Sequence, residues 1–157
     1  MDSESCGPNA PTEETMPTTA EENKGIARRI IEEVVEKGSL DAVDELYTED
    51  AVEHTPMGDF SGHEAIKEGF KMTRRAFSDY TVTVDDIIAE GDTVAARLTE
   101  RGTHDGEFLG IDPTGQEFEH QTMAFLRLEN GRVAEWWIQP DNLGLMRQLG
   151  VIEPPGE

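Results

Sequence analysis

The sequence predicts a single α+β domain in which helices come first and an antiparallel sheet follows. In the first half of the chain, apolar residues recur every three or four positions, as on one face of a helix; from Tyr80 onward they alternate with polar residues. Turn signals at Glu90-Gly91-Asp92 and Asn130-Gly131 separate the alternating segments and are typical of hairpins. The 157 residues suffice for one domain with a core, but not comfortably for two.

The domain boundaries follow from composition. Residues 1–18 are rich in Ser, Thr, Pro, Gly and Glu and offer almost nothing to bury, so we expect a disordered acidic tail. We expect the domain to span residues 19–152 and a short C-terminal tail to span residues 153–157, which include Pro154-Pro155.

Three helices are expected before the sheet. Thr19 and Glu22 have the spacing of a capping box, and Gly38 ends the helix that they open. Ser39 can cap a short second helix, and residues 61–64 resemble a second capping box that opens the third. The core-facing stripe of the first helix consists of Ile26, Ala27, Ile30, Ile31, Val34 and Val35.

The strands are expected mostly in the second half. Residues 51–54 form a short edge strand between the second and third helices, and residues 80–90, 93–103, 117–128 and 132–140 form four longer strands rich in Val, Thr and Ile. A last amphipathic helix, residues 141–149, ends before Gly150.

The charge balance excludes some classes of partner. Acidic residues number 34 and basic residues 13, which gives a net charge of −21. Nucleic acids and anionic membrane surfaces need Lys and Arg, so neither is an expected partner. An acidic surface of this kind suits a halophile's salt-rich cytoplasm, although an ordinary acidic protein remains an alternative. A melting temperature that did not rise toward molar KCl would contradict the halophilic interpretation.

Cysteine and hydropathy patterns point to a cytoplasmic protein. Cys6 is alone, which rules out a disulfide framework and a thiolate metal site. No apolar stretch approaches the roughly 18 residues of a transmembrane helix, and no signal peptide is visible. The histidines lack ligand-type spacing, so no metal is expected.

The Asn130-Gly131 turn predicts which residues face each other in the last hairpin. With a regular two-residue turn, Glu129 faces Arg132, Ala124 faces Trp137, Thr122 faces Gln139 and His120 faces Asp141. These residues would share a mixed polar and aromatic face that lines a pocket. Met123, Phe125, Trp136 and Ile138 would form an apolar face that packs against helices or a partner subunit. A bulge would shift the register by one residue and separate His120 from Asp141.

Structural roles are the alternative for each of these residues. An Asp directly after a strand is most often a helix N-cap, and Asp141 lies where the last helix begins. Tryptophans such as Trp137 are more often anchors of a core or interface than substrate platforms. His54 and His104 lie beside loops, where exposed histidines are common, and His63 is expected at the surface.

Two long motifs and a closing helix resemble the SnoaL-like polyketide cyclases. Residues 101–115 read RGTHDGEFLGIDPTG and resemble the long loop of that family. Residues 127–141, RLENGRVAEWWIQPD, resemble its last hairpin, and residues 143–150, LGLMRQLG, resemble its closing helix. The resemblance covers about residues 23–150.

The resemblance implies a fold, an assembly and a reaction. The implied fold is the cone of nuclear transport factor 2, with helices laid into a curved antiparallel sheet. Such cones associate as homodimers or homotetramers through the outer sheet face. In the cyclases, the aspartate that matches Asp141 acts as general acid/base in an intramolecular aldol closure, without metal or cofactor.

The leading expectation is therefore a cofactor-free enzyme that acts beside a carbonyl group of a small hydrophobic molecule, by aldol-type cyclisation or isomerisation. Asp141 and His120 are the expected catalytic residues. The residues expected to bind substrate are His54, His104, Thr122, Trp137 and Gln139. A non-catalytic module that binds a hydrophobic metabolite, and a protein–protein adaptor that uses the outer sheet face, are the competing hypotheses.

Overall fold

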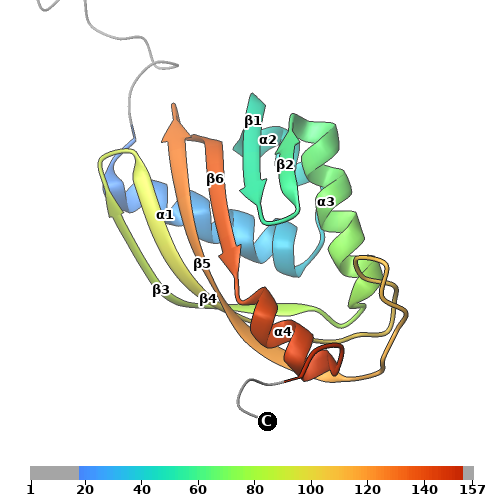
Figure 1. Cartoon of the computed structure of the whole chain (residues 1–157). Coiled ribbons are helices and arrows are strands. Elements are labelled where there is room, and N and C mark those ends of the chain that lie inside the picture. The colour runs from blue at the N-terminus through green and yellow to red at the C-terminus, as the bar shows by residue number, and fades with distance from the viewer. Residues whose placement is uncertain (1–17, 154–157) are drawn as a thin grey trace, which may run out of the picture.

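A curved six-stranded sheet organises the molecule (Figure 1). The computed structural model describes residues 18–153, so Cys6 and Pro154-Pro155 lie outside the described part of the chain. The sheet order is β2-β1-β6-β5-β4-β3, and only the β1–β6 pairing is parallel. The strands are β1 (Tyr47–Thr55), β2 (Gly58–Ser61), β3 (Thr81–Glu90), β4 (Thr93–Thr103), β5 (Glu117–Glu129) and β6 (Arg132–Pro140).

The helices cover one face of this sheet and its lower end (Figure 1). The helix α1 continues into a π-helical segment, η3, and the two run across the concave face, while α3 stands beside β1 and β2. Their bounds, with those of α2 and α4, are α1 (Ala20–Arg29), η3 (Ile30–Glu36), α2 (Asp41–Leu46), α3 (His63–Ala76) and α4 (Asn142–Leu149). The predicted α+β order is confirmed.

The helix starts were predicted with mixed success. Thr19 caps α1, and the reciprocal bonds between Thr19 and Glu22 complete the expected capping box. The predicted Ser39 cap is wrong, because Leu40 occupies the N-cap of α2 without a side-chain bond. The second box is also wrong, because Gly62, at φ 88°, is the N-cap of α3 and makes no side-chain bond. His63 is only partly exposed and bonds to Asp44.

Residues 51–54 belong to β1, which has β2 on one side and β6 on the other, so the prediction of an edge strand there is wrong. The edge next to β1 is formed by the four-residue β2.

The last hairpin begins in the predicted register and then leaves it. Asn130 and Gly131 both have positive φ, and Glu129 pairs with Arg132, as predicted. Beyond Leu128 a bulge at Ala134 shifts the pairing by one residue, so Leu126 pairs with Trp136 and Phe125 with Trp137. The predicted pairings of His120 with Asp141, Thr122 with Gln139 and Ala124 with Trp137 are therefore wrong.

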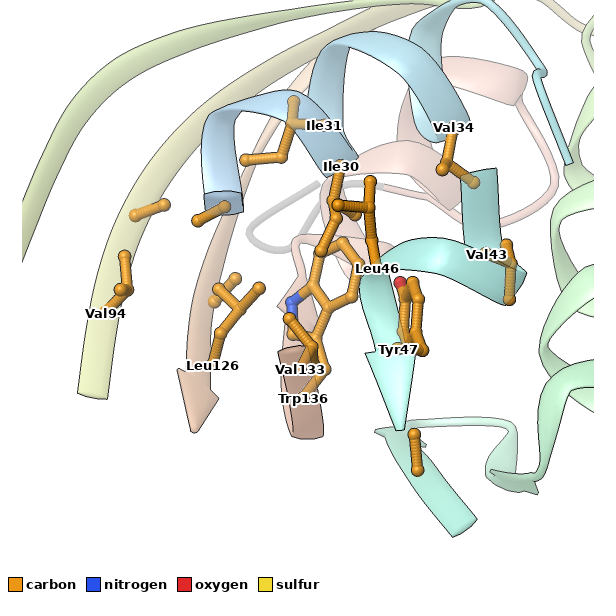
Figure 2. Close-up of a cluster of buried hydrophobic side chains, with 14 of the residues drawn as sticks. Ile30, Ile31, Val34, Val43, Leu46, Tyr47, Val94, Leu126, Val133 and Trp136 are labelled. Atoms are coloured by element: carbon orange, nitrogen blue, oxygen red, sulfur yellow. The ribbon is translucent and has the colours of Figure 1, made fainter. Parts of the chain in front are cut away.

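The bulge has a simple energetic reason. Without it, Glu135, Trp137 and Gln139 would follow Val133 onto the concave face. With it, that face receives the more apolar set of Trp136, Ile138 and Pro140, and the polar side chains turn outward. The core below them joins η3 to the sheet through Ile30, Ile31, Val34, Leu126 and Trp136 (Figure 2).

Candidate functional site

A cavity lies between the concave face of the sheet and helices α3 and α4. Its walls are largely apolar and come from η3, the sheet, α3 and α4. The apolar residues include Val35, Phe70, Phe77, Leu98, Trp136, Ile138 and Leu145. A smaller set of polar side chains faces the same space, namely Glu53, Thr73, Arg74, Tyr80, Glu100, His120 and Thr122. An apolar wall with a few polar groups is the usual composition of a site for a small organic molecule.

One pair of ionisable side chains stands on neighbouring strands at the α4 end of the cavity. Glu100 of β4 and His120 of β5 are cross-strand partners, and the carboxyl Oε1 lies 3.6 Å from the imidazole Nε2. Both residues are less than a tenth exposed. Burial raises the pKa of Glu100 above its ordinary value, against the opposing effects of His120, Thr122 and Tyr80. A carboxyl with a raised pKa next to an imidazole is a common acid/base arrangement.

A second carboxyl is buried on β1. The Tyr47 hydroxyl donates a 2.8 Å hydrogen bond to Glu53 Oε2, and Glu53 is only 4% exposed. Burial raises the pKa of Glu53 to about 7, although the bond from Tyr47 lowers it. Burial also raises the pKa of Tyr47 well above its ordinary value, so the phenol keeps its proton and remains the donor.

The cavity also contains polar atoms without partners. His120 Nδ1 and Trp136 Nε1 are buried and make no hydrogen bond to any residue in the range 18–153. Arg74, in contrast, is occupied, because its guanidinium donates to the carbonyl oxygens of Val35 and Glu36 at the end of η3. A buried group without a partner costs roughly 1–3 kcal/mol, and a ligand oxygen or a water molecule would remove that cost at either atom.

Of the residues predicted to form the site, His120 and Thr122 do line the cavity. Trp137 and Gln139 do not, and the prediction that they share a face with His120 is wrong because of the bulge at Ala134. Trp137 is 40% exposed on the outer face, where it pairs with Phe125.

The other predicted residues lie elsewhere. Asp141 is exposed and caps α4, accepting a 2.9 Å bond from the Gly144 amide. His54 stacks on Trp137 on the outer face and bonds to Glu135 and Asp59, which raise its pKa.

His104 is fully buried outside the cavity, where Thr114 donates its amide hydrogen to Nδ1. These contacts connect two positions of the segment between β4 and β5.

Glu53 and Glu100 were not predicted, yet the sequence carries a signal for both. Glu100 continues the alternation of the buried residues Val94, Ala96 and Leu98, and Glu53 follows buried Ala51 two positions later. A carboxyl on the apolar side of a strand is expensive to bury and therefore marks a candidate site.

Residues 18–153 contain neither a candidate metal site nor a helix that could span a membrane. No cluster of three or more His, Cys, Asp or Glu side chains is placed to hold a metal ion in that range. In the same range, no helix has the length and apolar character needed to cross a membrane.

Comparison with known families gives one clear assignment. Residues 25–149 match the family model described as SnoaL-like polyketide cyclase. The chain belongs to the SnoaL-like polyketide cyclase family. The curved sheet and its helices match this family's fold, which is the cone of nuclear transport factor 2, so the predicted fold is confirmed.

Relatives within the family are bacterial enzymes and solved structures. Aklanonic acid methyl ester cyclase DauD of Streptomyces sp. (strain C5) is 30% identical to this chain over 84% of both chains. Aklanonic acid methyl ester cyclase DnrD of Streptomyces peucetius is 32% identical over 68% of this chain and 73% of its own. The crystal structure of IdmH, a candidate polyketide cyclase from Streptomyces antibioticus, is 34% identical, with a TM-score of 0.72 over 82% of this chain and 98% of its own.

Proposed function

We propose that this SnoaL-like protein is a cyclase that closes a ring in a hydrophobic carbonyl compound by intramolecular aldol-type chemistry. The observation that carries the proposal is the Glu100–His120 pair, buried in an otherwise largely apolar cavity. Glu100 replaces Asp141 as the expected base, because Asp141 is exposed, caps a helix and does not line the cavity.

The reaction divides between these two side chains. Ionised Glu100 removes a proton from a carbon next to a carbonyl. His120 Nδ1, which has no hydrogen-bond partner among residues 18–153, lies in the same cavity to hydrogen-bond the enolate oxygen. The enolate carbon then forms a C–C bond to a second carbonyl carbon, whose oxygen takes back the proton from Glu100. The step is an isomerisation: its atoms and electrons balance without an external oxidant or reductant, so we propose no cofactor.

The charges in the cavity favour a neutral substrate. Glu53 and Glu100 already place two carboxyl groups there, and a free substrate carboxylate would be repelled by either in its ionised form. An ester carries no such charge. DauD and DnrD are described as methyl ester cyclases, and aklanonic acid methyl ester is therefore the first compound to test, with the free acid as the matched comparison.

The test measures two steps separately. The protein is incubated with the ester in deuterated buffer, and mass spectrometry follows both deuterium uptake at the acidic carbon and formation of the ring. We expect both with the ester and neither with the free acid. If the ester binds but neither step occurs, the cyclase proposal fails for this compound, and the competing hypothesis of a non-catalytic binding module gains support.

Replacing Asp141 separates a capping role from a catalytic one. Asp141→Ala should lower the free energy of unfolding by about 1 kcal/mol because the bond to the Gly144 amide is lost, whereas Asp141→Asn keeps a capping oxygen and should cost little. Both variants should keep turnover within about threefold of the native protein, measured by urea titration and product formation. If the Asp141→Asn protein were stable but inactive, Asp141 rather than Glu100 would be the acid/base.

The outer sheet face suggests how the protein associates. Ile88, Phe125 and Trp137 are exposed large apolar residues, and the strand pairings align them in one row across the sheet. We propose that this face forms a homodimer or part of a homotetramer.

Phe125→Glu should then yield a monomer by light scattering in molar KCl. Leu143→Glu, a change at an equally exposed position on α4, should leave the assembly intact. A native protein that is itself monomeric would contradict the proposal.

A further inference from the structure

The two buried carboxyls lie far apart on the cavity wall, because β6 and β5 separate their strands. The cross-strand row that contains Glu53 runs through Trp136 and Leu126 to Val94 on β4, and Glu100 lies further along that strand. Neighbouring strands lie roughly 4.8 Å apart, and a strand rises about 3.3 Å per residue. On a flat sheet, Glu100 would therefore lie ~14 Å from Glu53 across the strands and ~20 Å from it along them. Curvature shortens both separations, but one proton cannot be shared between the two groups. Glu53 is therefore not part of the Glu100–His120 pair.

We propose that Glu53, in its protonated form, is a binding residue that donates a hydrogen bond to a carbonyl oxygen at the end of the substrate remote from Glu100. The inference rests on the proposed function, because it names a second recognition point for the same substrate. The substrate class is accordingly an extended polyketide ester with a ketone or quinone oxygen far from the carbon that is deprotonated.

The contacts of Glu53 determine the direction of this bond. Tyr47 donates to Oε2, and no other hydrogen bond to the Glu53 side chain is formed by residues 18–153. With Oε2 accepting, the proton of the neutral carboxyl resides on Oε1 and is left for a ligand in the cavity that Glu53 lines. A donor on the protein requires an acceptor on the ligand, which is a carbonyl oxygen rather than a hydroxyl used as donor.

The surroundings of Glu53 keep it protonated near neutral pH. Its cross-strand neighbours, Phe60 of β2 and Trp136 of β6, do not titrate. The other titratable or charged side chains that line the cavity are Arg74, Tyr80, Glu100 and His120, and none of them forms an ion pair with Glu53 in the described chain. Burial therefore dominates and raises the pKa of Glu53 to about 7, so binding should weaken as the pH rises through that value.

The experiment measures the dissociation constant of aklanonic acid methyl ester by calorimetry at pH 6 and pH 8.5. The variants are Glu53→Gln, which keeps a donor without a titration, and Glu53→Leu, which removes it. At pH 6 we expect Glu53→Gln to bind like the native protein and Glu53→Leu to bind about tenfold more weakly. The ratio of native affinity to Glu53→Gln affinity should fall about tenfold between pH 6 and pH 8.5. Any titration of the ligand affects both proteins equally and cancels in this ratio.

Each outcome decides one question. If Glu53→Leu binds like the native protein at pH 6, or if native affinity relative to Glu53→Gln rises with pH, the proposed donor role is wrong while the cyclase proposal stands. If the native protein neither binds nor converts the ester, the cyclase proposal fails for that compound. Infrared difference spectra of native protein minus Glu53→Gln without ligand then decide the state of Glu53, and absence of a protonated carboxyl band at pH 6 would overturn the inference.

Discussion

Glu100→Gln should lower the rate of ring closure by about a hundredfold to ten-thousandfold, the usual effect of losing a general acid/base. Glutamine keeps the size of the side chain, but it cannot take a proton from carbon. Deuterium uptake by the ester should fall by the same factor, because both steps need the same base. Single-turnover kinetics with the ester provide the measurement.

The pH dependence gives this variant a second signature. Since burial raises the pKa of Glu100, native activity should rise with pH through that raised value, and the rise should vanish in Glu100→Gln.

The contribution of Glu100 to the free energy of unfolding should fall as the pH rises. Below the unfolded-state pKa both states are protonated and burial of Glu100 carries no ionisation penalty. The penalty grows between the unfolded and the folded pKa and is complete above the folded one. Glu100→Gln should therefore melt higher than the native protein at pH 8, so that inactivity cannot be attributed to unfolding.

Glu119→Gln is the matched control. Glu119 lies on β5 next to His120, but its side chain points outward and pairs with Arg101. It should change neither the rate nor the pH profile. Equal losses in both variants would show that acidic surface charge, rather than the cavity carboxyl, supports the reaction.

The sequence predicted the elements better than the site because the two depend on different information. Capping at Thr19, the turn at Asn130-Gly131 and the alternation of β4 are local patterns, and each recurs in the structure. The contents of the cavity depend on which residues of β6 face inward. That choice was settled by the bulge at Ala134, which lies several residues from the turn that set the predicted register.

The sequence favoured Asp141 as the acid/base, whereas we propose Glu100, and the difference has a related reason. Asp141 occupies the motif position that the family resemblance emphasised, but a strand end followed by a helix start favours a capping role, and the structure shows the capping bond. Glu100 lies just outside the family motifs at residues 101–115, 127–141 and 143–150. Comparing each charged residue with the burial alternation of its own strand would have selected it, because its neighbours two and four positions back are buried.

Trp136→Ala should lower the free energy of unfolding by about 3–5 kcal/mol, the usual cost of removing a fully buried aromatic side chain. The indole is 2% exposed and packs near Tyr47 and Phe70, with ring centroids 6.4 Å and 6.5 Å away. It also belongs to the cluster with residues of η3 and α2 that Figure 2 shows. Loss of the Nε1–H group, which has no partner within residues 18–153, offsets part of the cost. Trp136→Phe removes the same group but fills most of the space, so it should lose less stability.

Trp137→Ala offers the sharpest control, because the same residue type is removed one position along the same strand. Trp137 is 40% exposed and faces away from the core, so its loss should cost about 1 kcal/mol or less in monomeric protein. Urea unfolding of both variants in the Phe125→Glu background removes any contribution from the proposed dimer. The two register alternatives predict opposite orders: with the bulge at Ala134 the larger loss belongs to Trp136, whereas an unbroken two-residue hairpin would place Trp137 inside and reverse the order.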